Sequence, residues 1–68
     1  MTHYISDDIF VTIHSITSWY ITICDTTLLM SDYLSLESFM STVIDTHVFL
    51  THSEEQQIAR YYMCFTAS

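Results

Sequence analysis

The pattern of apolar positions predicts a helix over residues 9–24, the longest stretch of the chain without a formal charge. Five apolar residues recur there at alternating intervals of four and three, the spacing of one helix face: Ile9, Ile13, Ile16, Tyr20 and Ile23. Ser6 can cap this helix, and Asp7 and Asp8 lie in its first turn, where negative charge suits the helix dipole. Residues 9–24 therefore fit a helix with a well-marked start.

The same residues fit β-strands less well. Odd positions from 9 to 23 hold six apolar residues of eight and even positions from 10 to 24 hold four, so an alternating pattern leaves both faces mixed. Ile, Val and Thr favour strands, but Gly, Pro and Asn, the usual residues of tight hairpin turns, are absent from the chain. We predict an all-α fold, a small three-helix bundle with the first helix central, as one domain over residues 1–68. The alternative is an α+β fold with residues 9–24 as strands.

Two further helices follow from the same spacing. The second is predicted from about residue 26 to residue 46, with Asp25 or Ser31 as its cap. The third begins at Ser53, which has the spacing of a capping box to Gln56. One face of the second helix is apolar and the other is rich in Ser and Thr, so one face is expected to pack and the other to face water.

The first predicted helix has apolar residues on nearly all sides, and a lone three-helix bundle would have difficulty covering them. Small chains bury a modest share of their surface and often need association with another chain. We therefore expect a second apolar patch to form an oligomer interface. Its predicted residues are Phe10, Val11, Trp19 and Ile21.

Charge sharpens the picture, because the chain has eight acidic residues, one Arg and no Lys, for a net charge of −7 in 68 residues. Binding to DNA, RNA or anionic membrane surfaces depends chiefly on Lys and Arg, so direct binding to nucleic acids or to such membranes is disfavoured. The expected partner is a larger protein with a basic surface, toward which opposite charge would speed association.

Candidate chemistry is sparse. Four His and two Cys residues form no recognised metal motif, and neither thiol is placed for activation, so we expect no metal, no cofactor and no catalysis. Residues 9–24 are shorter than the roughly 20 residues that span a bilayer, which makes a membrane segment improbable. The N-terminal stretch is acidic rather than basic, so no signal peptide is indicated and a cytoplasmic location is expected.

These features favour a small acidic protein-binding inhibitor that occupies a basic surface of a larger protein; if that surface normally binds nucleic acid, the carboxylates would stand in for phosphates. In general character the chain is similar to phage and mobile-element inhibitors of host defence, anti-CRISPR proteins of CRISPR-Cas complexes included, although no motif of a specific family is present. The alternative is a structural or regulatory homo-oligomer associating through its apolar first helix. The predicted partner-binding residues are Asp32, Leu34, Glu37, Asp45, Glu54, Glu55, Tyr61 and Tyr62.

Overall fold

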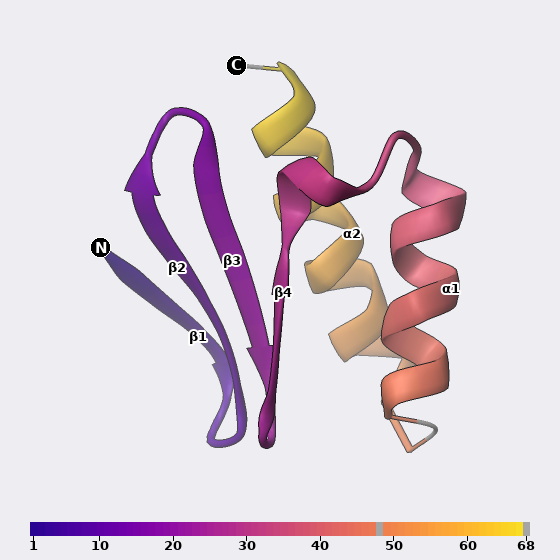
Figure 1. Ribbon diagram of the computed structural model, residues 1–68. Coiled ribbons are helices and arrows are strands. Elements are labelled where there is room, and N and C mark those ends of the chain that lie inside the picture. Colours follow the sequence, from indigo (N-terminus) through magenta and orange to yellow (C-terminus); the bar gives the residue numbers. More distant parts are fainter. Residues whose placement is uncertain (48, 68) are drawn as a thin grey trace.

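The protein is a two-layer α+β fold in which a four-stranded antiparallel sheet is followed by two helices (Figure 1). The computed structural model describes residues 1–47 and 49–67. The strands lie in chain order: β1 (Thr2–Ser6), β2 (Ile9–Ser15), β3 (Ser18–Ile23) and β4 (Thr26–Leu29). A short 3-10 helix, η1 (Met30–Asp32), leads to α1 (Leu36–Thr46) and α2 (His52–Ala67). Both α-helices cover the same face of the sheet, which leaves its other face open (Figure 1).

The predicted three-helix bundle is wrong. Residues 9–24, expected to form the central helix, form β2 and β3 of a hairpin instead, as in the alternative considered above. Val11 pairs with Ile21, and Ile13 pairs with Trp19, so the apolar odd positions of both strands share one face. That face is buried under the helices, and covering it stabilises the hairpin more than the helical spacing of the same residues could.

The hairpin turns show how a sheet forms without Gly, Pro or Asn. Each turn has two residues: Asp7–Asp8, Ile16–Thr17 and Cys24–Asp25. Among them only Cys24 has a positive φ, 54°. The other two turns are each accompanied by a shift in strand register, before Ser6 and before Ser15. A β-bulge raises the local twist of a strand pair, so these bulges supply the twist that a glycine turn would otherwise give.

The helices begin later in the chain, or at other caps, than predicted. Residues 26–32 of the expected second helix form β4 and η1, and α1 is capped by Ser35, whose hydroxyl accepts a hydrogen bond from the Ser38 N–H at 3.1 Å. The third predicted helix exists as α2, but its capping box joins Thr51 and Glu54 rather than Ser53 and Gln56. The Thr51 N–H donates to the Glu54 carboxylate at 2.8 Å, and the Glu54 N–H donates to the Thr51 hydroxyl at 3.1 Å.

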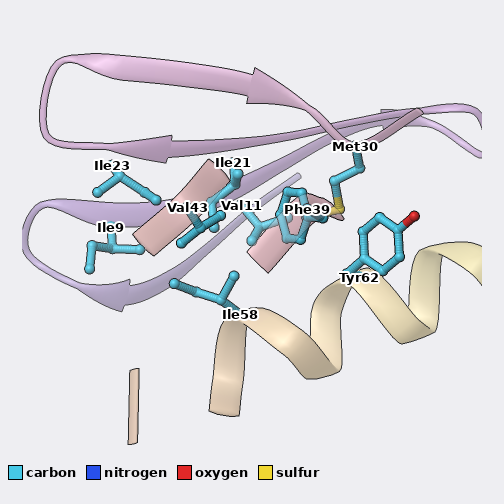
Figure 2. Close-up of a cluster of buried hydrophobic side chains, with 9 residues drawn as sticks. All are labelled: Ile9, Val11, Ile21, Ile23, Met30, Phe39, Val43, Ile58 and Tyr62. Carbon is cyan, nitrogen blue, oxygen red and sulfur yellow. The ribbon is translucent and has the colours of Figure 1, made fainter. Parts of the chain in front are cut away.

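The core lies between the sheet and the helices (Figure 2). At its centre the rings of Phe39 and Tyr62 stack with centroids 4.7 Å apart. The Tyr62 hydroxyl donates a hydrogen bond to the Tyr33 carbonyl oxygen at 2.8 Å, so the polar tip of this buried ring has a partner. The fully or nearly buried residues are Ile9, Val11, Ile21, Ile23, Met30, Phe39, Val43, Ile58 and Tyr62.

Candidate interaction surfaces

The fold separates charged residues from the sheet. The four strands contain no Asp, Glu, Lys or Arg, so every acidic residue lies in a turn, in η1 or in a helix. In an antiparallel meander the first and third turns meet at one end of the sheet, and the second turn lies at the other. The connection from α1 to α2 lies at the same end as the first and third turns (Figure 1). Residues distant in sequence are thereby brought to one end of the molecule.

Six of the eight acidic residues lie at this end, which we call the acidic end. They are Asp7, Asp8, Asp25, Asp45, Glu54 and Glu55. A hydrogen bond from the Cys24 N–H to the Asp8 carbonyl oxygen, 2.8 Å long, joins the first turn to the third. The acidic residues look evenly spread in the sequence, and the strand topology is what gathers them.

Glu54 has a structural role in the acidic end as well as a charge. Hydrogen bonds from the backbone N–H and the side chain of Thr51 lower the pKa of its carboxyl from the ordinary value of 4.5, and the Ser6 hydroxyl and the charge of His47 act in the same direction. These donors favour the charged form of the carboxyl, and the hydrogen bond that it accepts from the Thr51 N–H fixes the start of α2.

Phe49 is an exposed apolar side chain in the connection between α1 and α2, at the acidic end. It is 84% exposed and lies in the connection between Asp45 and Glu54. Its N–H approaches His47 Nδ1 at 3.4 Å, and the two rings are 6.4 Å apart at a near-perpendicular angle. Phe49 is not among the predicted partner-binding residues, although its place between two predicted helices and near three acidic residues in the sequence was an available signal.

The predicted partner-binding residues are divided between the two ends of the molecule. Asp45, Glu54 and Glu55 belong to the acidic end, whereas Asp32 and Leu34 lie between β4 and α1, and Glu37 lies in the first turn of α1. At this opposite end Leu34 is 99% exposed, and Ile16 in the β2–β3 turn is 69% exposed. The structure therefore does not bring the predicted residues together as one surface.

The two adjacent tyrosines also have different environments. Tyr62 is 3% exposed and belongs to the core, so it cannot serve as a surface contact in this fold. Tyr61 is half-buried, and its ring lies 5.6 Å from that of His3 on β1. Of the pair, only Tyr61 keeps a face toward solvent.

The predicted oligomer interface is dispersed in the same way. Val11 and Ile21 are completely buried under the helices, because their strand positions point toward α1 and α2. Trp19 faces the same layer, where its ring lies 5.7 Å from that of Phe65. Only Phe10, at an even position of β2, points to the uncovered side of the sheet. A helix would have grouped these four residues, and a strand pair separates them by face.

The uncovered side of the sheet, which we call the open face, carries two rows of paired residues. One row is Thr2, Thr12, Tyr20 and Leu29, and the other is Tyr4, Phe10, Thr22 and Thr27. Tyr4 is 70% exposed, and its ring lies 5.3 Å from that of Phe10. The Thr22 and Thr27 hydroxyls are hydrogen-bonded at 3.1 Å. The open face is thus aromatic and hydroxyl-rich, and it has no formal charge.

A pocket of about 250 Å³ lies along α2, lined by Gln57, Arg60, Tyr61 and Cys64. Arg60 is the single basic residue of the chain. Cys24 and Cys64 are both exposed. Within residues 1–47 and 49–67, no three His, Cys, Asp or Glu side chains are grouped so that they could hold a metal ion. The pocket offers one cation but no arrangement of an acid, a base and a nucleophile.

None of the helices in the described part of the chain has the length and apolar character needed to cross a membrane. Comparison with known proteins gives no relative: no family model, no curated protein and no solved structure matches the chain. The surfaces described above are therefore the evidence on which a function can be proposed.

Proposed function

We propose that this protein is a small acidic inhibitor that acts in the cytoplasm by docking its acidic end on a basic surface of a larger protein. The observation that carries this proposal is that the exposed ring of Phe49 and six acidic residues, contributed by two turns and two helices, lie at the same end of the fold. Hot spots of protein interfaces combine a large apolar anchor with a polar rim. Phe49 is the anchor, and the carboxylates at this end are the rim.

The charge of the acidic end indicates the chemistry of the partner. Carboxylates pair best with Arg and Lys, and a surface rich in both is typical of sites that bind nucleic acid. By occupying such a surface, the acidic end would exclude the phosphates that normally bind there. Because the chain is similar only in general character to phage and mobile-element inhibitors of host defence, we propose such a complex, CRISPR-Cas included, as the class of target.

The first experiment captures partners of the tagged protein from bacterial lysate at low and high salt. We expect a basic protein that is retained at low salt and released at high salt, because exposed ion pairs are screened as ionic strength rises. The captured protein is then tested for nucleic-acid binding with and without the inhibitor. Capture of no salt-sensitive basic protein, or binding that leaves its nucleic-acid contacts unchanged, would contradict the proposal.

Two matched pairs of variants locate the docking surface. Removing two charges from the acidic end, D25N with D45N, should weaken binding roughly fivefold to tenfold, since each exposed ion pair contributes up to about 1 kcal/mol. Removing two charges from the opposite end, D32N with E37Q, changes the net charge equally and should have little effect. Likewise F49A should weaken binding about 30-fold or more, as expected for a hot spot, whereas L34A should not. Equal effects within either pair would show that the acidic end is not the docking surface.

A further inference from the structure

We propose that the open face of the sheet binds the open face of a second copy of this chain, so that two sheets pack face to face as a twofold-symmetric dimer. The open face consists of Thr2, Tyr4, Phe10, Thr12, Tyr20, Thr22, Thr27 and Leu29. This proposal is independent of the acidic end, because it involves a different layer of the molecule and a different chemistry.

Charge favours a second copy as the occupant. The open face lacks formal charge in a chain of net charge −7, so a basic partner would find no carboxylate there with which to pair. Burying unpaired Lys or Arg against this face would cost desolvation energy. A second copy presents the same aromatic rings and hydroxyls, and neither partner then has to bury a charge.

Like charge between the two copies limits their relative orientation. If the twofold axis lies between the two sheets and perpendicular to their strands, the strands of the two copies run in opposite directions. The acidic end of one copy then lies beside the Ile16–Thr17 turn of the other. Strands of six or seven residues, β2 and β3, hold the two acidic ends about 20 Å apart at 3.3 Å per residue. That separation exceeds two Debye lengths at physiological ionic strength, about 8 Å each, so the repulsion is largely screened.

The chemistry of the face suits packing between sheets. Aromatic rings on one sheet fit between β-branched residues on another when the sheets lie about 10 Å apart. Phe10 and Tyr4 are in ring contact in one row, and Tyr20 contacts His14 with centroids 5.4 Å apart near the other row. The Thr residues between these rings leave space for the rings of the second copy. An isologous contact of this kind is the commonest form of homo-oligomer.

The size of the face predicts the strength of the dimer. Four strands spaced about 4.8 Å apart and about 20 Å long give a face of roughly 400 Å² per copy, or roughly 800 Å² in total. This area is below the roughly 1,200 Å² of ordinary stable interfaces, so the dimer is expected to be weak, with a Kd of roughly 10 to 100 μM.

Sedimentation equilibrium of the full chain from 5 to 500 μM, in about 50 and 500 mM salt, tests the proposal. We expect a monomer–dimer equilibrium that tightens at the higher salt, because screening removes repulsion between like-charged copies. This direction is opposite to that expected for docking of the acidic end. A monomer throughout, or a dimer that dissociates as salt rises, would overturn the proposal.

Variants assign the interface. T12E places a carboxylate near the centre of the open face and should weaken the dimer at least tenfold, whereas S41E adds the same charge on the exposed side of α1 and should not. Y4S removes an exposed ring from β1 without adding charge and should weaken the dimer severalfold, and it keeps the proposal testable if T12E fails to fold. Equal dimerisation of Y4S and the natural chain, or of folded T12E and S41E, would refute the assignment.

The two proposals can fail separately. Dimerisation should be unchanged or stronger in D25N with D45N, and capture of a basic partner should be unaffected by Y4S. If T12E or Y4S instead abolished capture of a partner while the natural chain stayed monomeric, the open face would be occupied by a different protein and the dimer would be refuted.

Discussion

The hydroxyl of Tyr62 offers a direct test of how the core is built. In Y62F the ring remains stacked on Phe39, 4.7 Å away, and only the hydrogen bond to the Tyr33 carbonyl oxygen is lost. A typical hydrogen bond contributes about 1 kcal/mol to stability, and leaving a buried acceptor without its donor costs about 1–3 kcal/mol. This hydrogen bond is part-buried, so water can replace the lost donor only in part. We expect Y62F to lower the free energy of unfolding by about 1.5 kcal/mol.

This loss is large for a chain of 68 residues. Stabilities of roughly 0.05–0.15 kcal/mol per residue give a total of about 3–10 kcal/mol. A loss of about 1.5 kcal/mol should lower Tm by about 6–12 °C, as measured by far-UV circular dichroism and by urea unfolding at fixed protein concentration. Y62A, which also removes the ring, is expected to cost about 3–5 kcal/mol and to leave little folded protein.

The neighbouring tyrosine is the matched control. Tyr61 is half-buried, and its hydroxyl makes no hydrogen bond within the described residues, so Y61F should change stability by less than about 0.5 kcal/mol. The core between sheet and helices requires Y62F to have a lower free energy of unfolding than Y61F. If the two variants unfold at the same urea concentration, Tyr62 does not make the buried contact described here and the packing of α2 must be reconsidered.

Three further substitutions probe the turns, the caps and the faces of the sheet. C24G should stabilise the fold by about 0.5–1 kcal/mol, because relief of left-handed backbone strain exceeds the entropy cost of Gly. C24V should destabilise the fold. If urea unfolding showed C24V to be more stable than C24G, the positive φ of 54° at this turn would be contradicted. The pKa of Glu54 is lowered in the fold, so its carboxylate contributes to the free energy of unfolding above pH 4.5, and this contribution is lost as pH falls through the lowered pKa. The difference in unfolding free energy between the natural chain and E54Q should therefore close at acidic pH. A difference that does not change with pH would contradict this role of Glu54. V11T should lower the free energy of unfolding by about 1–3 kcal/mol, because it buries a hydroxyl, whereas T12V on the opposite face of β2 should not. Equal effects of the two variants in thermal melts would contradict the assignment of one face of β2 to the core and the other to the open face.

The incorrect helix prediction has an identifiable physical cause. Ile9, Ile13 and Ile23 fit both periodicities, so the apolar residues alone could not decide between helix and strand. The polar residues were decisive: Ser15 and Thr17, the two polar odd positions, are the last residue of β2 and a residue of the turn that interrupts the face. Residues 9–24 form two strands of seven and six residues, close to the usual length of a strand.

The absence of Gly, Pro and Asn does not prevent this chain from forming hairpin turns. Two of the three turns adopt no positive φ and recover the required twist through bulges, and the third places Cys24 in the left-handed region. Single-sequence turn rules describe preferences of a few tenths to about 2 kcal/mol, which tertiary packing of a buried sheet can exceed. The third helix was predicted within one residue of its start because helix spacing is a local signal, although its capping box joins Thr51 and Glu54 rather than Ser53 and Gln56.

The surfaces depended on topology and could not be read locally. The grouping of the acidic residues follows from strand order, which brings Asp7 and Asp25 to the end where α1 meets α2. Phe10 and Val11 were assigned to one patch, yet adjacent residues of a strand point to opposite faces, so only Phe10 lies on the open face.

The arrangement of charge ties these surfaces together. A sheet with one uncovered face risks non-specific association, and proteins often prevent it by placing charges on the strands. This chain has no charge on its strands and instead places six carboxylates at one end. Charge placed there leaves the open face able to pack against another copy, while it restricts that packing to orientations that keep the acidic ends apart. The acidic end of each copy would then remain exposed at opposite ends of a dimer, so self-association and partner binding are compatible in a single molecule.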